Sequence, residues 1–204
     1  MHIAIAGNIG SGKTTLARLL AKHYRWQAHY EEVDDNPYLD DFYHQMERWS
    51  FNLQIYFLNA RFRQIVNIRN SKKNYIQDRT IYEDAYIFAP NLHAMGLMTN
   101  RDFENYRSLF DLLEELIECP DLIIYLRSTV PNLVAQIHNR GRDYENSISI
   151  DYLSRLNERY EAWAQTYTKG KLLIVDVDQL NFVDNPEDLG TIINRIDAEI
   201  HGLF

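Results

Sequence analysis

The sequence predicts an α/β fold, in which a five-stranded parallel sheet is covered by helices on both faces and makes three layers. Short apolar runs alternate along the whole chain with longer segments whose apolar residues recur at helical spacing. A glycine-rich stretch, 7–14, joins the first apolar run to the first helical segment. A chain of 204 residues, 46% of them hydrophobic, suits one domain with a substantial core, so we expect a single domain over 1–204.

The predicted strands are short and apolar, as parallel strands buried on both faces usually are. The clearest is 122–126, which follows Pro120, and the weakest is 26–30. In chain order the strands are 3–6, 26–30, 75–77, 122–126 and 172–175. We expect the strand at 26–30, which leads to Glu31, to lie beside the first strand of the sheet.

The predicted helices lie between these strands. Pro37, Pro131 and Pro186 mark helix starts, because proline fits the first turn of a helix, where its missing N–H is not needed. The segments with helical spacing are 14–23, 47–70, 83–95, 100–118, 131–140, 150–167 and 186–200.

Composition narrows the class of protein. The net charge is −8, so a general DNA- or RNA-binding role is not expected, because phosphate backbones need a basic surface. The lone cysteine, Cys119, excludes an internal disulfide and suits a reducing compartment. No apolar run has the length of a membrane span, and the first strand begins at once, without a signal or transit peptide. We therefore expect a cytoplasmic protein that binds neither nucleic acid nor membrane.

The most informative motif fits the pattern G-x-x-x-x-G-K-[ST] and follows a strand. Its glycines leave backbone N–H groups free to surround phosphate oxygens, and the next helix adds positive charge at its N-terminus. Lys13 can reach the β- and γ-phosphates of a nucleotide, and the Thr14 hydroxyl can bind Mg²⁺. The motif and the residue after it predict an ATP-binding loop, a P-loop, composed of Gly7, Asn8, Ile9, Gly10, Ser11, Gly12, Lys13, Thr14 and Thr15. The alternative, a chance glycine-rich turn, does not explain the complete motif.

Two carboxylates follow predicted strands, at the edge of the sheet where α/β proteins bind ligands. Glu31 could accept a proton from an attacking hydroxyl, and Asp78 could hold Mg²⁺. A helix cap or a surface acid is the alternative for each residue alone.

Farther along, Arg140-Gly141-Arg142 predicts a cationic lid at about 139–147 that closes over phosphates, or else a basic helix end.

In this order and spacing, the motifs resemble the deoxynucleoside kinase family over nearly the whole chain, with the bacterial deoxyadenosine and deoxyguanosine kinases most similar. The segments that carry the resemblance are 7–14, 31–39, 49–51 with Gln54, 78–80, 82–89 and 140–142. The resemblance implies ATP-dependent phosphorylation of the 5′-hydroxyl of a purine deoxynucleoside in nucleotide salvage, deoxyadenosine first and deoxyguanosine next, with Mg²⁺. It also implies a homodimer through helices such as 47–70 and 100–118.

The resemblance also implies roles for single residues. Glu31 is the expected general base, Arg79 lies near the acceptor hydroxyl, and Lys13, Arg140 and Arg142 complete the catalytic set. Asp78 and Thr14 serve Mg²⁺, and Asp178 belongs to a loop beside the ATP adenine. The remaining substrate contacts are expected from Tyr43 and Glu145 at the 3′-hydroxyl, Gln54, Arg61 and Asp84 at the base, and Trp49 and Phe88 as walls of the base slot. One departure is Gln136, where similar kinases carry a further lid arginine.

The base site can also be argued from the residues. The Gln54 amide offers one donor and one acceptor, which can pair with an adenine edge. Arg61 lies seven residues later, on the same helix face, and Asp84 could bind its guanidinium bidentately. An arginine so placed suits the N7 and O6 acceptors of a purine. An ordinary surface ion pair with a solvated glutamine is the alternative.

Three other functions fit the sequence less well. A GTPase switch needs Asn-Lys-x-Asp after a strand, and the nearest match, 194–197, lacks the lysine and lies in a predicted helix. A monophosphate kinase of thymidylate-kinase type needs basic residues near Glu31, yet 30–41 is acidic. A non-enzymatic nucleotide switch does not explain Glu31 beside an enclosed base slot.

Overall fold

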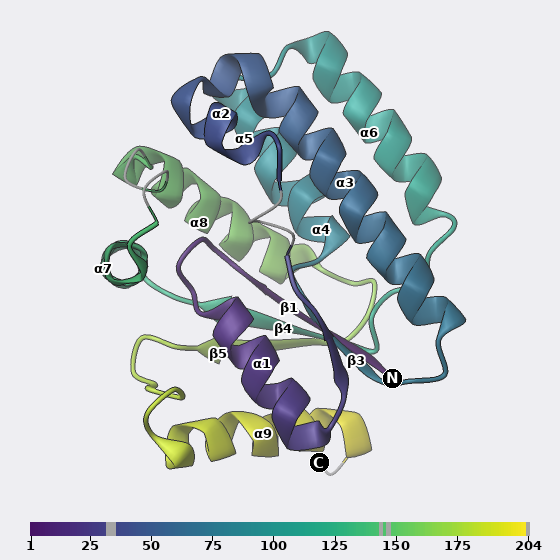
Figure 1. Ribbon diagram of the computed structural model, residues 1–204, viewed down its shortest axis with the longest axis vertical. Helices are drawn as coiled ribbons and strands as arrows, with labels where there is room; N and C mark the ends of the chain where they lie inside the picture. Colours follow the sequence, from purple (N-terminus) through teal and green to yellow (C-terminus); the bar gives the residue numbers. More distant parts are fainter. Residues whose placement is uncertain (32–35, 143–144, 146–147, 203–204) are drawn as a thin grey trace.

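The computed structural model describes residues 1–31, 36–142, 145 and 148–202. Its five strands form one parallel sheet in the order β2-β3-β1-β4-β5 (Figure 1). The strands are β1 His2–Gly7, β2 Gln27–His29, β3 Tyr75–Asp78, β4 Leu122–Arg127 and β5 Leu172–Asp176. The predicted α/β fold with a five-stranded parallel sheet is confirmed.

The order of the strands corrects one expectation. β3 lies between β2 and β1, so the strand that leads to Glu31 is at the edge of the sheet and not beside the P-loop strand. Glu31 also lies two residues beyond the end of β2 at His29. Strand order depends on long-range pairing, which the apolar pattern of a short strand does not specify.

The helices closely follow the predicted segments. They are α1 Lys13–Tyr24, α2 Leu39–His44, α3 Met46–Asn70, α4 Ile81–Glu83, α5 Ala89–Ala94, α6 Asn100–Glu114, α7 Val130–Arg140, α8 Ile150–Thr166 and α9 Pro186–His201. The predicted helix 83–95 is interrupted: α4 continues into a π-helical turn, η1 Asp84–Phe88, before α5. Such turns occur often at functional sites. The predicted helix 100–118 ends at Glu114.

The sheet has a core on each face, because successive side chains of a strand point to opposite sides. Ile3 and Ile5 of β1 pack with residues of α1 and α9 on one face. Ala4 and Ala6 face the larger cluster, which includes residues of α3, α6 and α8. Figure 1 shows α1 and α9 on one side of the sheet and the larger helical group on the other. No helix in the described ranges is long and apolar enough to span a membrane.

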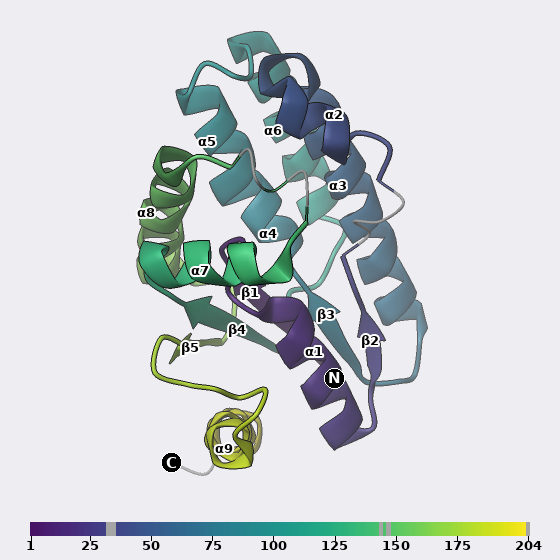
Figure 2. The ribbon, with the colours of Figure 1, turned by 60° about the vertical axis from the view of Figure 1, so that its left-hand side comes forward.

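The fold brings the P-loop against α7 at the carboxyl end of β1. Gly10 has φ 87°, and a Cβ added there would lie 2.8 Å from the Leu133 carbonyl oxygen and 3.0 Å from Ile137 Cγ1. Figure 2 shows α7 across this end of the sheet, above α1. Glycine at position 10 therefore meets both a backbone requirement and a packing requirement.

We predict that Gly10→Ala destabilises the nucleotide-free protein by roughly 1–3 kcal/mol, the usual cost of a strained backbone conformation. The matched control is Gly190→Ala in α9, where a Cβ meets nothing within 4 Å. Alanine there should stabilise the protein by about 0.5–1 kcal/mol, because glycine is unfavourable inside a helix. Denaturant titration of both variants measures the free energies, and equal effects would contradict the prediction.

Candidate active site

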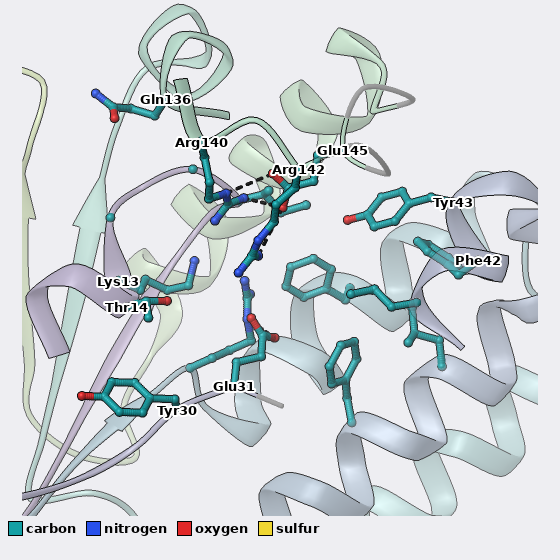
Figure 3. Close-up of a pocket in the computed structure, with 18 of the residues that line it drawn as sticks. Lys13, Thr14, Tyr30, Glu31, Phe42, Tyr43, Gln136, Arg140, Arg142 and Glu145 are labelled. Carbon is teal, nitrogen blue, oxygen red and sulfur yellow. Dashed lines mark hydrogen bonds and ion pairs between the residues drawn. The ribbon is translucent and has the colours of Figure 1, made fainter. Parts of the chain in front are cut away.

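A cavity of about 680 Å³ opens beside the carboxyl ends of β1 and β3, between the P-loop, α2, α3, η1 and the end of α7. Figure 3 shows side chains from these separate segments converging on it. The structure brings these predicted site residues to its lining: Ile9, Gly10, Gly12, Lys13, Thr14, Thr15, Glu31, Tyr43, Gln54, Arg79, Asp84, Phe88, Arg140, Arg142 and Glu145. The others lie outside the lining: Gly7, Asn8, Ser11, Trp49, Arg61, Asp78 and Asp178.

The P-loop is held by its own polar groups and by α8. The Lys13 ammonium donates a hydrogen bond to the Asn8 carbonyl oxygen at 2.8 Å, across the loop. The Asn8 amide donates to the Leu153 carbonyl and to Asn157 Oδ1, both on α8. Asn8 therefore anchors the loop, while Lys13 reaches the cavity.

The environment of Lys13 disfavours its charge. Burial, and then the positive charge of Arg79, lower the pKa of Lys13 to about 7, against the attraction of Asp78 and Glu83. A phosphate group beside this ammonium would favour the protonated form and raise the pKa again. When an anion binds beside Lys13 near neutral pH, the lysine therefore takes up a proton.

Asp78 and Thr14 make a group that fits Mg²⁺. The Thr14 hydroxyl donates to Asp78 Oδ2 at 2.5 Å, and the buried Oδ1 has no hydrogen-bond partner among the described residues. Burial raises the pKa of Asp78, although Lys13 opposes the shift. Mg²⁺ commonly takes one or two protein oxygens, with waters and substrate phosphates as its other ligands. The described ranges hold no group of three or more His, Cys, Asp or Glu side chains that could hold a metal by themselves.

Glu31 lies between two arginines. Its Oε1 is 2.7 Å from Arg61 Nη2 and 2.9 Å from Arg79 Nε. Burial raises the pKa of Glu31, but the charges of Arg79, Arg61 and Lys13 outweigh burial and bring the pKa to about 2. The carboxylate is therefore ionised at neutral pH, and both arginine contacts are made by the same oxygen, Oε1.

The pairing of Arg61 differs from the expected fork. Its Nε lies 3.1 Å from Asp84 Oδ2, while its Nη2 binds Glu31, so the guanidinium joins two carboxylates and does not bind Asp84 bidentately. Arg61 is fully buried, and Asp84 lines the cavity. Burial raises the pKa of Asp84 to about 7, although Arg61 and Arg79 oppose the shift. The group that faces a ligand is therefore the carboxylate.

The apolar wall of the cavity also differs from expectation. Trp49 packs against Tyr38, at a ring separation of 5.8 Å, and lies outside the lining. Phe88 does line the cavity, and the rest of the apolar wall comes from Phe42 and Phe57, together with Leu39 and Leu53. These residues come from α2, α3 and η1, three elements that a single helical pattern does not connect.

Gln54 lies in this apolar part of the cavity. The residue is 2% exposed, and its Oε1 is buried without a hydrogen-bond partner among the described residues. A buried polar atom usually has a partner, so this oxygen suits a ligand that donates a hydrogen bond.

The expected lid falls partly outside the described residues, which include 139–142 and 145 of the range 139–147. Gly141, with φ 65°, ends α7 as a left-handed cap. Arg140 donates to Glu145 from Nε at 3.0 Å and from Nη2 at 2.5 Å, and Arg142 Nη1 lies 3.5 Å from Glu145. The segment is therefore both a helix end and a cationic wall of the cavity.

The structure also places three more of the residues singled out from the sequence, Tyr43, Gln136 and Asp178. Figure 3 shows the Tyr43 hydroxyl pointing toward Glu145 and Arg142, whereas the Gln136 side chain extends away from Arg140. Asp178 accepts hydrogen bonds from Ser128, Thr129 and Asn132 at the start of α7. In this structure Asp178 fixes the beginning of that helix, and its carboxylate lies away from the cavity lining.

Sequence reasoning missed Glu83 and Tyr160. Glu83 accepts hydrogen bonds from the Gly7 amide and the Tyr160 hydroxyl, and it pairs with Arg79. The spacing of Thr80 and Glu83 is a helix-capping signal that could have marked Glu83, although not its contact with the P-loop. No local pattern points to Tyr160.

A P-loop at the end of the central strand, a lysine, a pair that fits Mg²⁺, and an ionised carboxylate beside an enclosed slot define a phosphotransferase that uses a nucleoside triphosphate. Comparison with known proteins then identifies the family. The profile of the deoxynucleoside kinase family matches residues 3–201. The chain belongs to this family and is a deoxynucleoside kinase.

Individual relatives cover nearly the whole chain. The deoxyadenosine/deoxycytidine kinase of Bacillus subtilis is 38% identical over 202 residues, which are 98% of this chain and 93% of the relative. The deoxyadenosine kinase of Dictyostelium discoideum is 41% identical over 192 residues, 94% of this chain and 77% of the relative. The deoxyguanosine kinase of Lactobacillus johnsonii is 34% identical over 207 residues, 97% and 92% of the two chains.

A solved structure has the same fold. The deoxyadenosine kinase of M. mycoides with bound dATP superposes with a TM-score of 0.85, at 29% identity, over 97% of this chain and 99% of the other.

The pKa of Lys13 generates a prediction about ATP binding. Below pH 7 the lysine is protonated before and after binding, so affinity should be highest there. Above pH 7 binding takes up a proton, and affinity should fall by about tenfold per pH unit until the pKa of the bound state is reached. Calorimetry from pH 6.5 to 9 measures the slope. The Lys13→Ala variant should bind weakly without this slope and should lack turnover, and equal slopes in both proteins would contradict the assignment.

Proposed function

We propose that this kinase transfers a phosphoryl group from ATP to the 5′-hydroxyl of a purine deoxynucleoside, with deoxyadenosine preferred and deoxyguanosine next, in nucleotide salvage. The single observation that carries the proposal is the position of Glu31. This carboxylate lines the same cavity as Lys13 of the P-loop and Gln54 of the apolar slot. A deoxynucleoside bound in the slot would bring its hydroxyl to Glu31 and face the donor phosphates.

The chain supplies positive charge for the phosphates from several elements. Lys13, Arg79, Arg140 and Arg142 all line the cavity. Positive groups placed around a moving phosphoryl group stabilise its negative charge in the transition state. Thr14 and Asp78 would hold Mg²⁺, which neutralises phosphate charge when bound. Phosphate oxygens could replace Glu145 as the partners of Arg140 and Arg142. Glu145 would then be free to bind a sugar hydroxyl.

Glu31 would orient the acceptor hydroxyl and take its proton. With a pKa of about 2, its carboxylate is a weak base at neutral pH. Weak basicity suffices in a loose phosphoryl-transfer transition state, because the hydroxyl becomes strongly acidic only as its bond to phosphorus forms. Oε2, which is not the atom held by the arginines, is the oxygen that would accept the proton.

The preference for adenine rests on Gln54 and Asp84. The Gln54 amide can donate to and accept from the adenine edge, and its Oε1 lacks a partner among the described residues. Asp84 faces the cavity as an acceptor when ionised. The exocyclic amino group of adenine or cytosine can donate to it, whereas guanine O6 is itself an acceptor. Deoxycytidine is thus a second candidate acceptor, as the name of the Bacillus subtilis relative says of that protein.

We also propose a homodimer of single-domain chains (1–204) that acts in the cytoplasm, with a lid at about 139–147. Leu109 and Leu112 of α6 are 37% and 59% exposed, and Leu116 just beyond it is 56% exposed. A second copy packed along α3 and α6 would cover this apolar stripe. Light scattering of the wild type and of Leu112→Glu tests the proposal, and a monomeric wild type would overturn it.

For the chemical step, we predict that Glu31→Gln lowers the single-turnover rate by about 10²-fold or more, the usual size for general base catalysis. Deoxynucleoside affinity should change far less, because the amide keeps the shape of the side chain. Rapid-quench measurement of phosphorylation, with a separate binding titration, gives both quantities.

The matched control for Glu31→Gln is Glu114→Gln, which removes a partly buried carboxylate paired with Lys169, outside the cavity lining. Its turnover should equal that of the wild type. We also expect Glu32→Gln, which changes the neighbouring carboxylate, to be nearly silent; Glu32 lies outside the described ranges. A wild-type rate for Glu31→Gln would refute the base assignment.

For base choice, we predict that Gln54→Ala lowers kcat/KM for deoxyadenosine by the equivalent of about 1–3 kcal/mol, the cost of a lost buried hydrogen bond. ATP affinity should remain unchanged, because Gln54 lies in the apolar slot. Asn52→Ala removes an amide from the same helix outside this cavity and serves as control. A panel of four deoxynucleosides ranks the acceptors, and an equal loss for ATP and deoxyadenosine would place Gln54 elsewhere.

A further inference from the structure

Arg79 has a backbone conformation that side-chain-bearing residues rarely adopt. Its φ is 72°, in the left-handed region, directly after the last residue of β3. Its amide donates to the Ile5 carbonyl oxygen at 2.8 Å, which continues the pairing of β3 with β1. Such strain at a functional site persists only where the surrounding structure holds the residue in place. The contacts of the side chain show what holds it.

The Arg79 guanidinium has carboxylates on two sides. Its Nε lies 2.9 Å from Glu31, which lines the cavity. Its Nη1 donates to the Tyr160 hydroxyl at 3.1 Å and lies 3.4 Å from Glu83 Oε1. Neither Glu83 nor Tyr160 lines the cavity, so both contact the arginine from behind the site.

Glu83 is fixed in place by backbone groups of two segments. It is fully buried, and its Oε2 accepts a hydrogen bond from the Thr80 amide at 2.6 Å, as part of a capping box. Its Oε1 accepts from the Gly7 amide at 3.1 Å. The same carboxylate oxygen therefore contacts Arg79 and the first residue of the P-loop.

Tyr160 joins the same two segments from α8. Its hydroxyl lies 2.8 Å from the Gly7 carbonyl oxygen and 2.8 Å from Glu83 Oε1, so its one proton can be donated to either acceptor. Its ring stacks on Tyr125 at 5.6 Å and meets Phe88 edge-on at 6.4 Å. The hydroxyl thus connects Arg79 with the Gly7 carbonyl group and with Glu83, and the ring is held by packing.

We propose that Glu83 and Tyr160 are positioning residues that fix the Arg79 guanidinium relative to the P-loop. They keep the arginine that faces the acceptor hydroxyl in register with the loop that holds the donor phosphates. This inference rests on the proposed role of Arg79 in phosphoryl transfer. A guanidinium that is displaced from its position stabilises the transition state much less. Breaking its contacts with Glu83 and Tyr160 should therefore lower kcat and leave the binding of both substrates nearly unchanged.

The experiment compares Tyr160→Phe with Tyr125→Phe. Both remove one tyrosine hydroxyl and keep one of two stacked rings, but the Tyr125 hydroxyl donates to Glu161 and does not contact Arg79. Tyr160→Phe should lower kcat by about 10- to 100-fold, as a misplaced reacting geometry does. KM for deoxyadenosine should stay within about twofold, since the residue acts only on the transition state. Tyr125→Phe should keep the wild-type kcat.

A wild-type kcat for Tyr160→Phe, or an equal loss in both variants, would overturn the proposal. If Tyr160→Phe does not fold, Glu83→Gln replaces it with the same expected split between kcat and KM. Melting temperatures of all variants separate a loss of stability from a loss of rate.

A double-variant cycle tests whether Tyr160 acts through Arg79. In an Arg79→Ala background, Tyr160→Phe should cause no further loss of kcat, because the group it positions is gone. Losses that multiply would overturn the inference while leaving the role of Arg79 intact. A wild-type kcat for Arg79→Ala alone would instead refute that role, and with it the inference.

Discussion

A buried row of alternating charges connects the parts of this site. It runs from Asp84 through Arg61, Glu31 and Arg79 to Glu83, with successive separations of 3.1, 2.7, 2.9 and 3.4 Å. Taking one such charge out of water is costly, and only close pairing on both sides offsets the cost. Removing an inner member takes one counter-charge away from each of its two neighbours. The row therefore connects Asp84 and Glu31, which line the cavity, with Glu83, which contacts the P-loop.

Local motifs could be predicted from the sequence because their chemistry lies within a few residues. The P-loop, the strand before it and the position of Asp78 at the end of β3 need only spacing and hydrophobic pattern. The order of the strands could not be predicted in the same way, since β2 is short and pairs with only one neighbour.

Side-chain partners were harder to predict than elements. Arg61 was expected to bind Asp84 bidentately, but α3 also brings it to Glu31, a residue from a different segment. Trp49 shares a helix with Gln54, yet it faces Tyr38 and lies outside the cavity lining. Glu83 meets Gly7 across 76 positions of sequence. Such contacts follow from the packing of whole helices, so the spacing of residues in the sequence does not predict them.

The π-helical turn at Asp84–Phe88 has a consequence for the length of this segment. Glu83, just before the turn, contacts the P-loop, while Asp84 and Phe88, at the two ends of the turn, line the cavity. A π-turn holds one residue more than an α-turn, and each residue of a helix advances the next by about 100°. Loss of one residue here would therefore rotate α5 and everything after it against the sheet. Insertions and deletions in this turn should be far less acceptable than substitutions, so that its length is under tighter constraint than its composition.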